Sequence, residues 1–158
     1  MVNLEDGRQV LLADNVLQEV KPGNRWDSDW ALVIDPTETM VENQWNYFTP
    51  TRMLAVNVNT GERREIGKFM REEEPQVSPD GKYVAWFMDR TWHVYDIATG
   101  KTADVGANVP TELWDTIDEH PSPSMPWGTA GWTKGDGRFL VYDKNLSLIH
   151  ISEPTRPY

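Results

Sequence analysis

The sequence predicts an all-β protein folded as a partial β-propeller, with about two complete four-stranded blades plus two partial ones. Residues 54–67 (LAVNVNTGERREIG) return 39 residues later as residues 93–106 (HVYDIATGKTADVG). A turn followed by an apolar strand also occurs twice, and the chain has 8 Trp, 5 Tyr and 4 Phe, large rings that suit the wedge between neighbouring blades. A repeat of roughly 40 residues, built from short β-rich runs around a Gly turn, is typical of a propeller blade.

Each copy of the repeat is predicted to form a β-hairpin. Thr60 and Gly61 of the first copy align with Thr99 and Gly100 of the second. Glycine stands where a tight turn needs positive φ, between two runs rich in β-branched and aromatic residues. The aligned pairs therefore mark the turns of two equivalent hairpins.

A second turn signal, residues 78–82 (SPDGK), precedes the apolar run 83–88. Proline presets φ, aspartate can bond its own backbone, and glycine completes the reversal that starts a strand. The unit returns as residues 132–138 followed by the run 139–142, at a longer spacing than 39 residues. A loop inserted between blades at residues 107–128 explains the difference.

Within these two apolar runs, residues 84–88 and 140–142 do not alternate cleanly between apolar and polar side chains. A sheet with one wet face would alternate, whereas sheets stacked face to face bury both faces of their inner strands. Both runs are therefore predicted to be buried on both faces.

The positions of the turns divide residues 1–145 among four blades, two of which are incomplete. Closed propellers typically have 4 to 8 blades of four strands, and each blade buries its faces only against its neighbours. We therefore expect an incomplete propeller region that exposes apolar faces and unpaired edges and aggregates when it is expressed alone. The portions are an outer hairpin at 4–20, blades at 21–67 and 68–106, and the opening of a further blade at 131–145.

The balance of charge narrows the classes of partner. The chain has 25 acidic and 15 basic residues and a formal net charge of -10, which argues against nucleic acid and against an anionic membrane surface. It has no stretch of about 18 apolar residues, so no membrane insertion is expected. Cysteine is absent, which excludes disulfides and thiolate zinc sites and leaves the compartment undecided.

Residues 146–158 (LSLIHISEPTRPY) differ in character from everything before them. The string LSLIHISEPTR resembles, residue for residue, the translated end of a transposase-type sequencing adapter. The expectation is therefore a non-native tail at 146–158 and a natural sequence cut near Asn145. The alternative is a real C-terminal strand with a Pro-rich tail.

Residues 77–85 (VSPDGKYVA) resemble the strand-opening motif of propellers in prolyl oligopeptidase and dipeptidyl-peptidase-like enzymes, a motif that Tol-system propellers share. Narrower support comes from residues 107–115 (ANVPTELWD), followed by 131–133 (GWT) and 141–143 (VYD). This order is similar to the N-terminal propeller region of large bacterial prolyl oligopeptidase family proteins and covers most of residues 70–145.

The resemblance implies a serine peptidase in which the propeller caps an α/β-hydrolase domain of the same parent chain and filters peptide substrates by size. Such a hydrolase needs a nucleophile on a G-x-S-x-G elbow and then Asp and His, and no G-x-S-x-G occurs here. His93 lies in a predicted strand and His120 in a Pro-rich loop. No catalytic, cofactor-binding or metal-binding residue is therefore assigned, and no cofactor is expected. The serines outside the tail, all in turn-like contexts, are Ser28, Ser78, Ser122 and Ser124.

The predicted insertion at 107–128 is the segment with potential for local function. Oxygen and imidazole ligands close in sequence can hold a hard or borderline cation, but the spacing here matches no motif with a defined loop geometry. A solvated loop stiffened by prolines is the favoured interpretation. The alternatives are that the insertion lines the cavity of the parent protein or contacts its hydrolase domain. The candidate ligands, between Trp114 and Trp127, are Asp115, Asp118, Glu119 and His120.

Two functional classes follow. The preferred one is the non-catalytic propeller gate of a prolyl oligopeptidase-like serine hydrolase. The resemblance alone implies that the parent is periplasmic or exported. The alternative is a stand-alone propeller of Tol-system or WD-repeat kind that serves as a protein-interaction module. The WD-repeat version is weakened because no blade strand ends in Trp-Asp: Tyr95 and Asp96 stand at that place.

Overall fold

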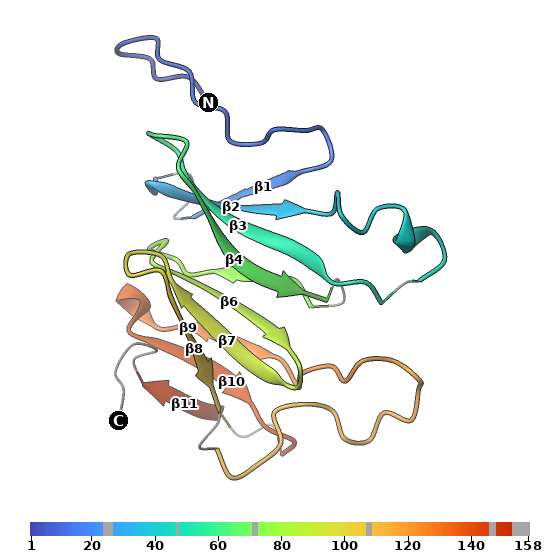
Figure 1. Ribbon diagram of the computed structural model, residues 1–158. Helices are drawn as coiled ribbons and strands as arrows, with labels where there is room; N and C mark the ends of the chain where they lie inside the picture. The colour runs from blue at the N-terminus through green and yellow to red at the C-terminus, as the bar shows by residue number, and fades with distance from the viewer. Residues whose placement is uncertain (24–26, 47, 71–72, 107–108, 146–147, 153–158) are drawn as a thin grey trace.

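The computed structural model describes residues 1–23, 27–46, 48–70, 73–106, 109–145 and 148–152, and its regular secondary structure is almost entirely β-strand (Figure 1). Within these ranges the short 3-10 helices η2 (Glu42–Gln44) and η3 (Lys134–Asp136) lie between strands. The strands are β1 (Glu19–Pro22), β2 (Trp30–Asp35), β3 (Thr51–Asn57), β4 (Arg63–Phe69), β5 (Gln76–Val77), β6 (Tyr83–Met88), β7 (Thr91–Asp96), β8 (Lys101–Val105), β9 (Thr129–Trp132), β10 (Arg138–Tyr142) and β11 (Leu148–Ser152).

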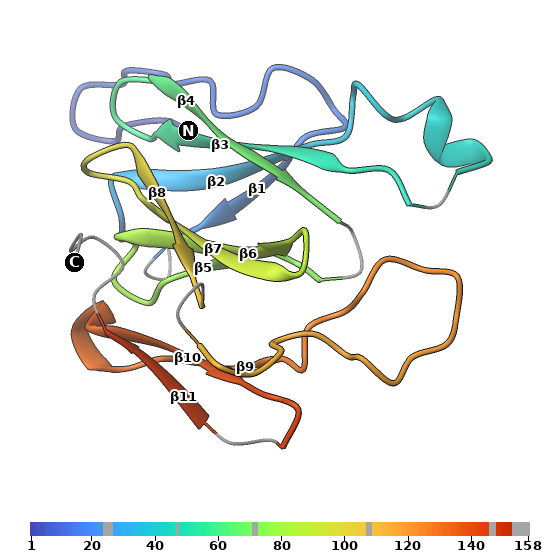
Figure 2. The same ribbon diagram turned by 60° about the horizontal axis from the view of Figure 1, so that its bottom comes forward.

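The strands form three antiparallel sheets in which each strand pairs with its neighbour in sequence. Two sheets have four strands, in the orders β1-β2-β3-β4 and β5-β6-β7-β8, and the third has the order β11-β10-β9. The sheets lie one above another in chain order in both views (Figures 1 and 2). Four-stranded meanders stacked face to face are the blades of a propeller, so the fold is all-β and a partial propeller, as the sequence predicts.

The boundaries of the sheets lie close to the predicted blades. The first sheet extends from residue 19 to 69 and the second from 76 to 105, against predictions of 21–67 and 68–106. The prediction of an outer hairpin over residues 4–20 is wrong at its C-terminal end, because residues 19 and 20 begin the first strand of the next sheet. Near the N-terminus, an antiparallel bridge between Val2 and Gln9 closes a tight turn.

The two copies of the sequence repeat form equivalent hairpins, β3–β4 and β7–β8, which confirms that prediction. Asn57 Oδ1 accepts hydrogen bonds from the amides of residues 59 and 60 (both 2.9 Å), and Asp96 Oδ1 accepts them from residues 98 and 99 (2.8 and 3.2 Å). Gly61 and Gly100 follow with φ of 77° and 71°. A side chain that bonds the backbone two residues on, followed by a left-handed glycine, fixes the same turn in each blade.

Apolar side chains fill both spaces between the sheets. Between the first and second sheets lie Leu32, Ile34, Met53, Ala55, Ile66, Phe69, Val84, Trp86, Tyr95 and Ile97. Between the second and third lie Ala85, Phe87, Trp92, Val94, Val105, Leu113, Phe139 and Val141. The middle sheet therefore contributes alternate residues of β6 to two different cores.

The prediction of burial on both faces is right for β6 and wrong for β10. In β6 the four residues from Val84 to Phe87 are all buried. In β10, Phe139 and Val141 are buried, whereas Leu140 and Tyr142 are only partly covered. The reason is that no other sheet in the described part of the chain packs on the far face of β9–β11.

The turns that open the second strand of each blade lie against one another at one end of the stack. Ser78 Oγ donates to Asp136 Oδ2 (2.6 Å), and the Asp80 amide donates to both Asp136 oxygens (3.1 Å each). On the other side, a Cβ placed on Gly81 would lie 2.9 Å from the Ser28 Cβ. The two repeated turn units are thus in direct contact, the later one supplying a carboxylate to the earlier.

The C-terminal residues 148–152 form β11, which pairs with β10 from Arg138 opposite Ser152 to Tyr142 opposite Leu148. The adapter origin of residues 146–158 stays a prediction about the coding DNA, and most of that segment lies outside the described residues.

Candidate functional site

The long connections of the chain emerge at the end of the sheets opposite the stacked turns. They are residues 36–50, between β2 and β3, and residues 106–128, between β8 and β9, and both project from the same side in the two views (Figures 1 and 2). The β4–β5 connection and the short β6–β7 turn lie at this end as well. Functional loops usually gather at one end of a rigid β scaffold, so this face is the candidate site.

The insertion after β8 is closed at its base by a short antiparallel ladder. Trp114 bridges Pro126, the Asp115 amide donates to the Met125 carbonyl (2.7 Å), and the amide of residue 127 donates to the carbonyl of residue 113 (3.2 Å). The insertion therefore has its own backbone hydrogen bonds rather than hanging free.

Leu113 fastens this ladder to the protein. Its side chain is buried in the core between the second and third sheets, directly over Gly106. Gly106 has a φ of 107°, and a Cβ at this position would lie only 2.4 Å from Leu113 Cδ1. Glycine is needed here for its backbone conformation and for the close approach of leucine.

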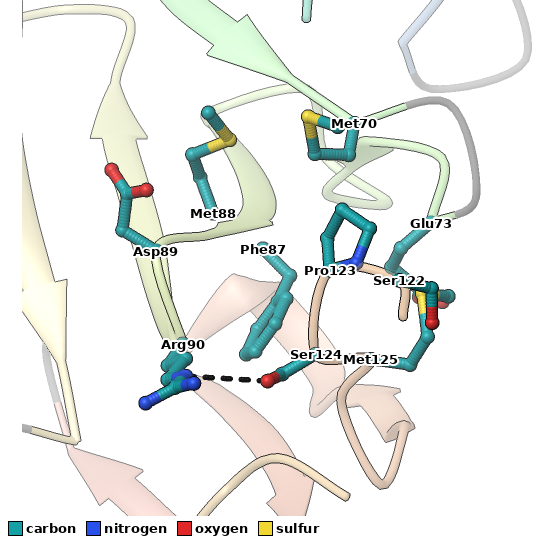
Figure 3. Close-up of a pocket in the computed structure, with 10 residues that line it drawn as sticks. All are labelled: Met70, Glu73, Phe87, Met88, Asp89, Arg90, Ser122, Pro123, Ser124 and Met125. Carbon is teal, nitrogen blue, oxygen red and sulfur yellow. Dashed lines mark hydrogen bonds between the residues drawn. The ribbon is translucent and has the colours of Figure 1, made fainter. Parts of the chain in front are cut away.

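A cavity of about 320 Å³ opens where the insertion returns over the second blade (Figure 3). Its volume lies in the range of small ligand pockets, roughly 300–1,000 Å³. Three methionine side chains, one phenylalanine and one proline make most of its wall, and the polar side chains come from three different segments. The lining residues are Met70, Glu73, Phe87, Met88, Asp89, Arg90, Ser122, Pro123, Ser124 and Met125.

The β6–β7 turn holds one wall of the cavity in an uncommon backbone conformation. Asp89 and Arg90 have φ of 52° and 64°, although neither is glycine. A two-residue hairpin turn with positive φ at both positions normally uses Asn-Gly or Asp-Gly, and left-handed non-glycine residues concentrate at functional sites. Arg90 Nε donates to Ser124 Oγ (3.2 Å; Figure 3). The Arg90 guanidinium also lies 5.8 Å from the centre of the Trp114 ring. The turn is thereby tied to the insertion.

Glu73 lines the other side of the cavity. Burial raises the pKa of this carboxyl, and the neighbouring Glu74 carboxylate raises it further. A carboxyl in a cavity with apolar walls favours its neutral form or a cationic neighbour.

The candidate metal ligands of the insertion do not converge. The Asp118 carboxylate accepts hydrogen bonds from the His120 amide and imidazole, and these bonds lower the pKa of Asp118. Asp115 binds the amides of residues 117 and 118, so its carboxylate also serves a local turn. In the parts of the chain that the structure describes, no group of three or more His, Asp and Glu side chains is placed to hold a metal ion.

The histidines and serines are likewise spread over the fold. His93 Nδ1 lies 2.7 Å from Asp104 and its Nε2 lies 3.3 Å from the Met88 carbonyl, with the ring stacked on Trp86. Ser78 belongs to the contact between blades. Neither His93 nor His120, the described histidine side chains, has a serine among its hydrogen-bond partners.

Sequence reasoning missed the cavity. The sequence places Ser122 and Ser124 only in turn-like contexts, yet both line the cavity and Ser124 accepts a hydrogen bond from Arg90. The signal within reach was Asp89-Arg90, a polar pair between two strands without the glycine that such a turn prefers. Nothing local shows that residues 122–125 fold back over this turn.

Together, the stacked meanders and the loop-bearing face define the class of the molecule as a partial β-propeller with its long connections at one end. No helix in the described ranges has the length and apolar character needed to cross a membrane.

No protein-family model matches the chain, and no curated protein matches it. Among solved structures it is similar to dipeptidyl peptidase 4 of Porphyromonas gingivalis, with 12% identity and a TM-score of 0.43 over 88% of this chain and 26% of that one. It is also similar to acylaminoacyl peptidase of Pyrococcus horikoshii, with 14% identity and a TM-score of 0.41 over 85% of this chain and 25% of that one. The chain thus spans about a quarter of the length of these two peptidases.

Proposed function

We propose that this chain is a non-catalytic propeller segment of a bacterial prolyl oligopeptidase-like serine peptidase, and that it caps and gates the α/β-hydrolase domain of that protein. The partners in this proposal are the hydrolase domain of the same parent chain and the peptides on which it acts. The motifs at residues 77–85 and 107–115 support the proposal through their resemblance to this family.

The observation that carries the proposal is the asymmetry of the stack. One end has short turns packed on one another, whereas the other end carries both long connections and the 320 Å³ cavity. A cap needs one face with loops that can contact a second domain and a passing peptide, supported by a rigid scaffold. The second blade supplies that scaffold, since it is packed on both faces.

A stand-alone propeller that binds proteins is the second candidate. It is favoured by the strand-opening motif at residues 77–85, which Tol-system propellers share. It predicts further blades and no hydrolase.

The genomic region around this coding sequence distinguishes the two proposals. We expect an open reading frame that departs from residues 146–158 after Asn145 and continues through further blades to a G-x-S-x-G elbow, followed by Asp and His. Further blades followed by a stop codon would support the interaction module instead. A genome that encodes residues 146–158 as they stand would refute the adapter origin.

The intact gene product then tests the activity. We expect it to react with a fluorophosphonate probe at the elbow serine and to cleave short peptides faster than folded proteins that contain the same sequence. Loss of this size selection on removal of the propeller is the result that gating requires. An intact product that reacts with the probe but shows no size selection would leave a hydrolase without a gate.

A further inference from the structure

The cavity of about 320 Å³ has an apolar wall that is rich in methionine. Three of the six methionines of the chain line it, one each from the β4–β5 connection, the end of β6 and the returning insertion. They are Met70, Met88 and Met125, and Phe87 and Pro123 complete the apolar wall. Methionine side chains are flexible and polarizable, so they adapt to ligands of different shape. The wall therefore suits a small apolar body, either aliphatic or aromatic.

One carboxyl group of the lining has no partner. In the described part of the chain the Glu73 carboxyl forms no ion pair or hydrogen bond, whereas the adjacent Glu74 carboxylate pairs with Lys21 Nζ (2.5 Å). The Glu73 amide donates to the Met70 carbonyl (3.3 Å), and both of these residues line the cavity. Burial and the nearby Glu74 carboxylate raise the pKa of Glu73, and a cation beside the Glu73 carboxyl would offset both effects.

The positive charge of the lining lies away from this carboxyl. Asp89 and Arg90 line the side of the cavity opposite Glu73 (Figure 3). Arg90 is held there by its hydrogen bond to Ser124 and lies near the Trp114 ring. The lining as a whole carries two carboxyl groups and one guanidinium, so its formal charge favours a cation on the Glu73 side.

We infer that this cavity binds a small primary amine with an apolar body, whose ammonium group contacts the Glu73 carboxylate while its body packs against the methionines. A volume of about 320 Å³ lies at the lower end of the range for small-molecule pockets, which matches a small amine. The inference goes beyond the proposed function, because every residue that it uses belongs to this chain and no hydrolase domain is needed for binding.

The test is an NMR titration of the full chain with isotope-labelled methionine methyl groups. The probe is phenethylamine, an aromatic amine that is a cation at neutral pH, and the matched compounds are the neutral phenethyl alcohol and the anionic hydrocinnamate. We expect phenethylamine to shift the methyl signals of the three cavity methionines and to leave those of Met1, Met40 and Met53 unchanged. It should bind about tenfold more tightly than phenethyl alcohol, because the hydrogen bond between an ammonium and a carboxylate is charge-assisted. Hydrocinnamate should bind most weakly.

The decisive variant is Glu73→Gln, which keeps the shape of the side chain and removes its charge. It should weaken the binding of phenethylamine by about tenfold and leave the binding of phenethyl alcohol unchanged. The matched control is Glu74→Gln, which removes the adjacent carboxylate. Glu74 is ion-paired with Lys21 and is not part of the lining, so this variant should change the binding of phenethylamine by less than about twofold.

Equal binding of phenethylamine and phenethyl alcohol would overturn the inference, as would equal losses in the two glutamine variants. So would a titration that leaves the signals of the cavity methionines unchanged. A lysine side chain of a peptide presents the same ammonium group, and tighter binding of N-acetyl-lysine methylamide than of phenethylamine would replace the small amine by a peptide side chain. None of these results bears on whether the gene encodes a hydrolase, so the inference and the proposed function fail separately.

Discussion

The carboxylate of Asp136 should be the main polar link between the second and third sheets. Its side chain is 2% exposed and accepts from the Ser78 hydroxyl at 2.6 Å and from the Asp80 amide at 3.1 Å. Hydrogen bonds to a charged group contribute about 1.5–3 kcal/mol each, and a buried donor that loses its acceptor costs about 1–3 kcal/mol.

Replacement of Asp136 by asparagine should therefore lower the free energy of unfolding by about 2 kcal/mol, because the amide keeps one acceptor and presents a donor to groups that donate. Replacement of Asp136 by alanine should lower the free energy of unfolding by about 4 kcal/mol, because alanine removes both acceptor oxygens. Alanine must also adopt the φ of 58° at this position, which costs an L-residue without a polar side chain roughly 1–2 kcal/mol more.

Urea unfolding followed by tryptophan fluorescence, at low protein concentration to limit association, measures these losses. A double-mutant cycle of Ser78→Ala with Asp136→Asn should give a coupling energy of about 1–2 kcal/mol, since the two side chains share a short hydrogen bond. Additive effects, or a loss under about 0.5 kcal/mol for alanine at 136, would show that the turns do not hold the sheets together.

Three further outcomes follow from local geometry. Gly106→Ala should destabilise the chain by about 2–4 kcal/mol and make the insertion more sensitive to proteolysis, because the new Cβ would clash with Leu113 and the φ at this position is positive. The control is Gly135→Ala, where φ is also positive but no atom lies close to the new Cβ. Asn57→Ala should lower the free energy of unfolding by about 1 kcal/mol, because it removes the side-chain acceptor of the β3–β4 turn. An unchanged free energy of unfolding would argue against that role. Lowering the pH should destabilise the chain through protonation of Asp35. Asp35→Asn should therefore make the free energy of unfolding depend less on pH in the acid range.

The direction of the acid effect follows from the shift of the Asp35 pKa. Burial alone would raise it, but hydrogen bonds from Thr37, Arg52 and Gln18 outweigh burial and hold the pKa well below its ordinary range. A carboxyl whose pKa is lower in the folded state stabilises the fold above its unfolded pKa of about 3.9, and this contribution is lost as the pH falls from there toward the folded value. Unfolding midpoints between pH 5 and pH 2 measure the loss, and a variant profile identical to that of the unchanged chain would contradict it.

The repeat and its turns could be predicted because their chemistry is local. Asn57 and Asp96 each bond the two amides that follow, and Gly61 and Gly100 supply the positive φ, so a few consecutive residues determine the hairpin. The same reasoning placed β6 between two layers, since its unbroken apolar run leaves no face for water.

The parts that sequence reasoning missed depend on residues far apart in the chain. Asp136 belongs to a recognisable turn, but its partners lie in the turn of the preceding blade. The cavity exists because the insertion returns to place Ser124 beside Arg90. Leu140 is only partly buried because no further sheet packs on its side of β10 in the described part of the chain. The apolar run of β10 alone could not show this, because it resembles the run of β6.

The central claim is that the sheets stack in chain order as sectors of a propeller. The contact between the β1–β2 and β5–β6 turns tests it directly, because a Cβ at Gly81 would lie 2.9 Å from the Ser28 Cβ, within a small shift of the roughly 3.8 Å typical of disulfides. The chain has no cysteine of its own. We predict that the double variant Ser28→Cys with Gly81→Cys forms an intramolecular disulfide on mild oxidation, seen as faster migration without reductant. The pair Ser28→Cys with Gly135→Cys, in the first and third sheets, should not. Absence of the first disulfide, or faster formation of the second, would contradict the stacked arrangement.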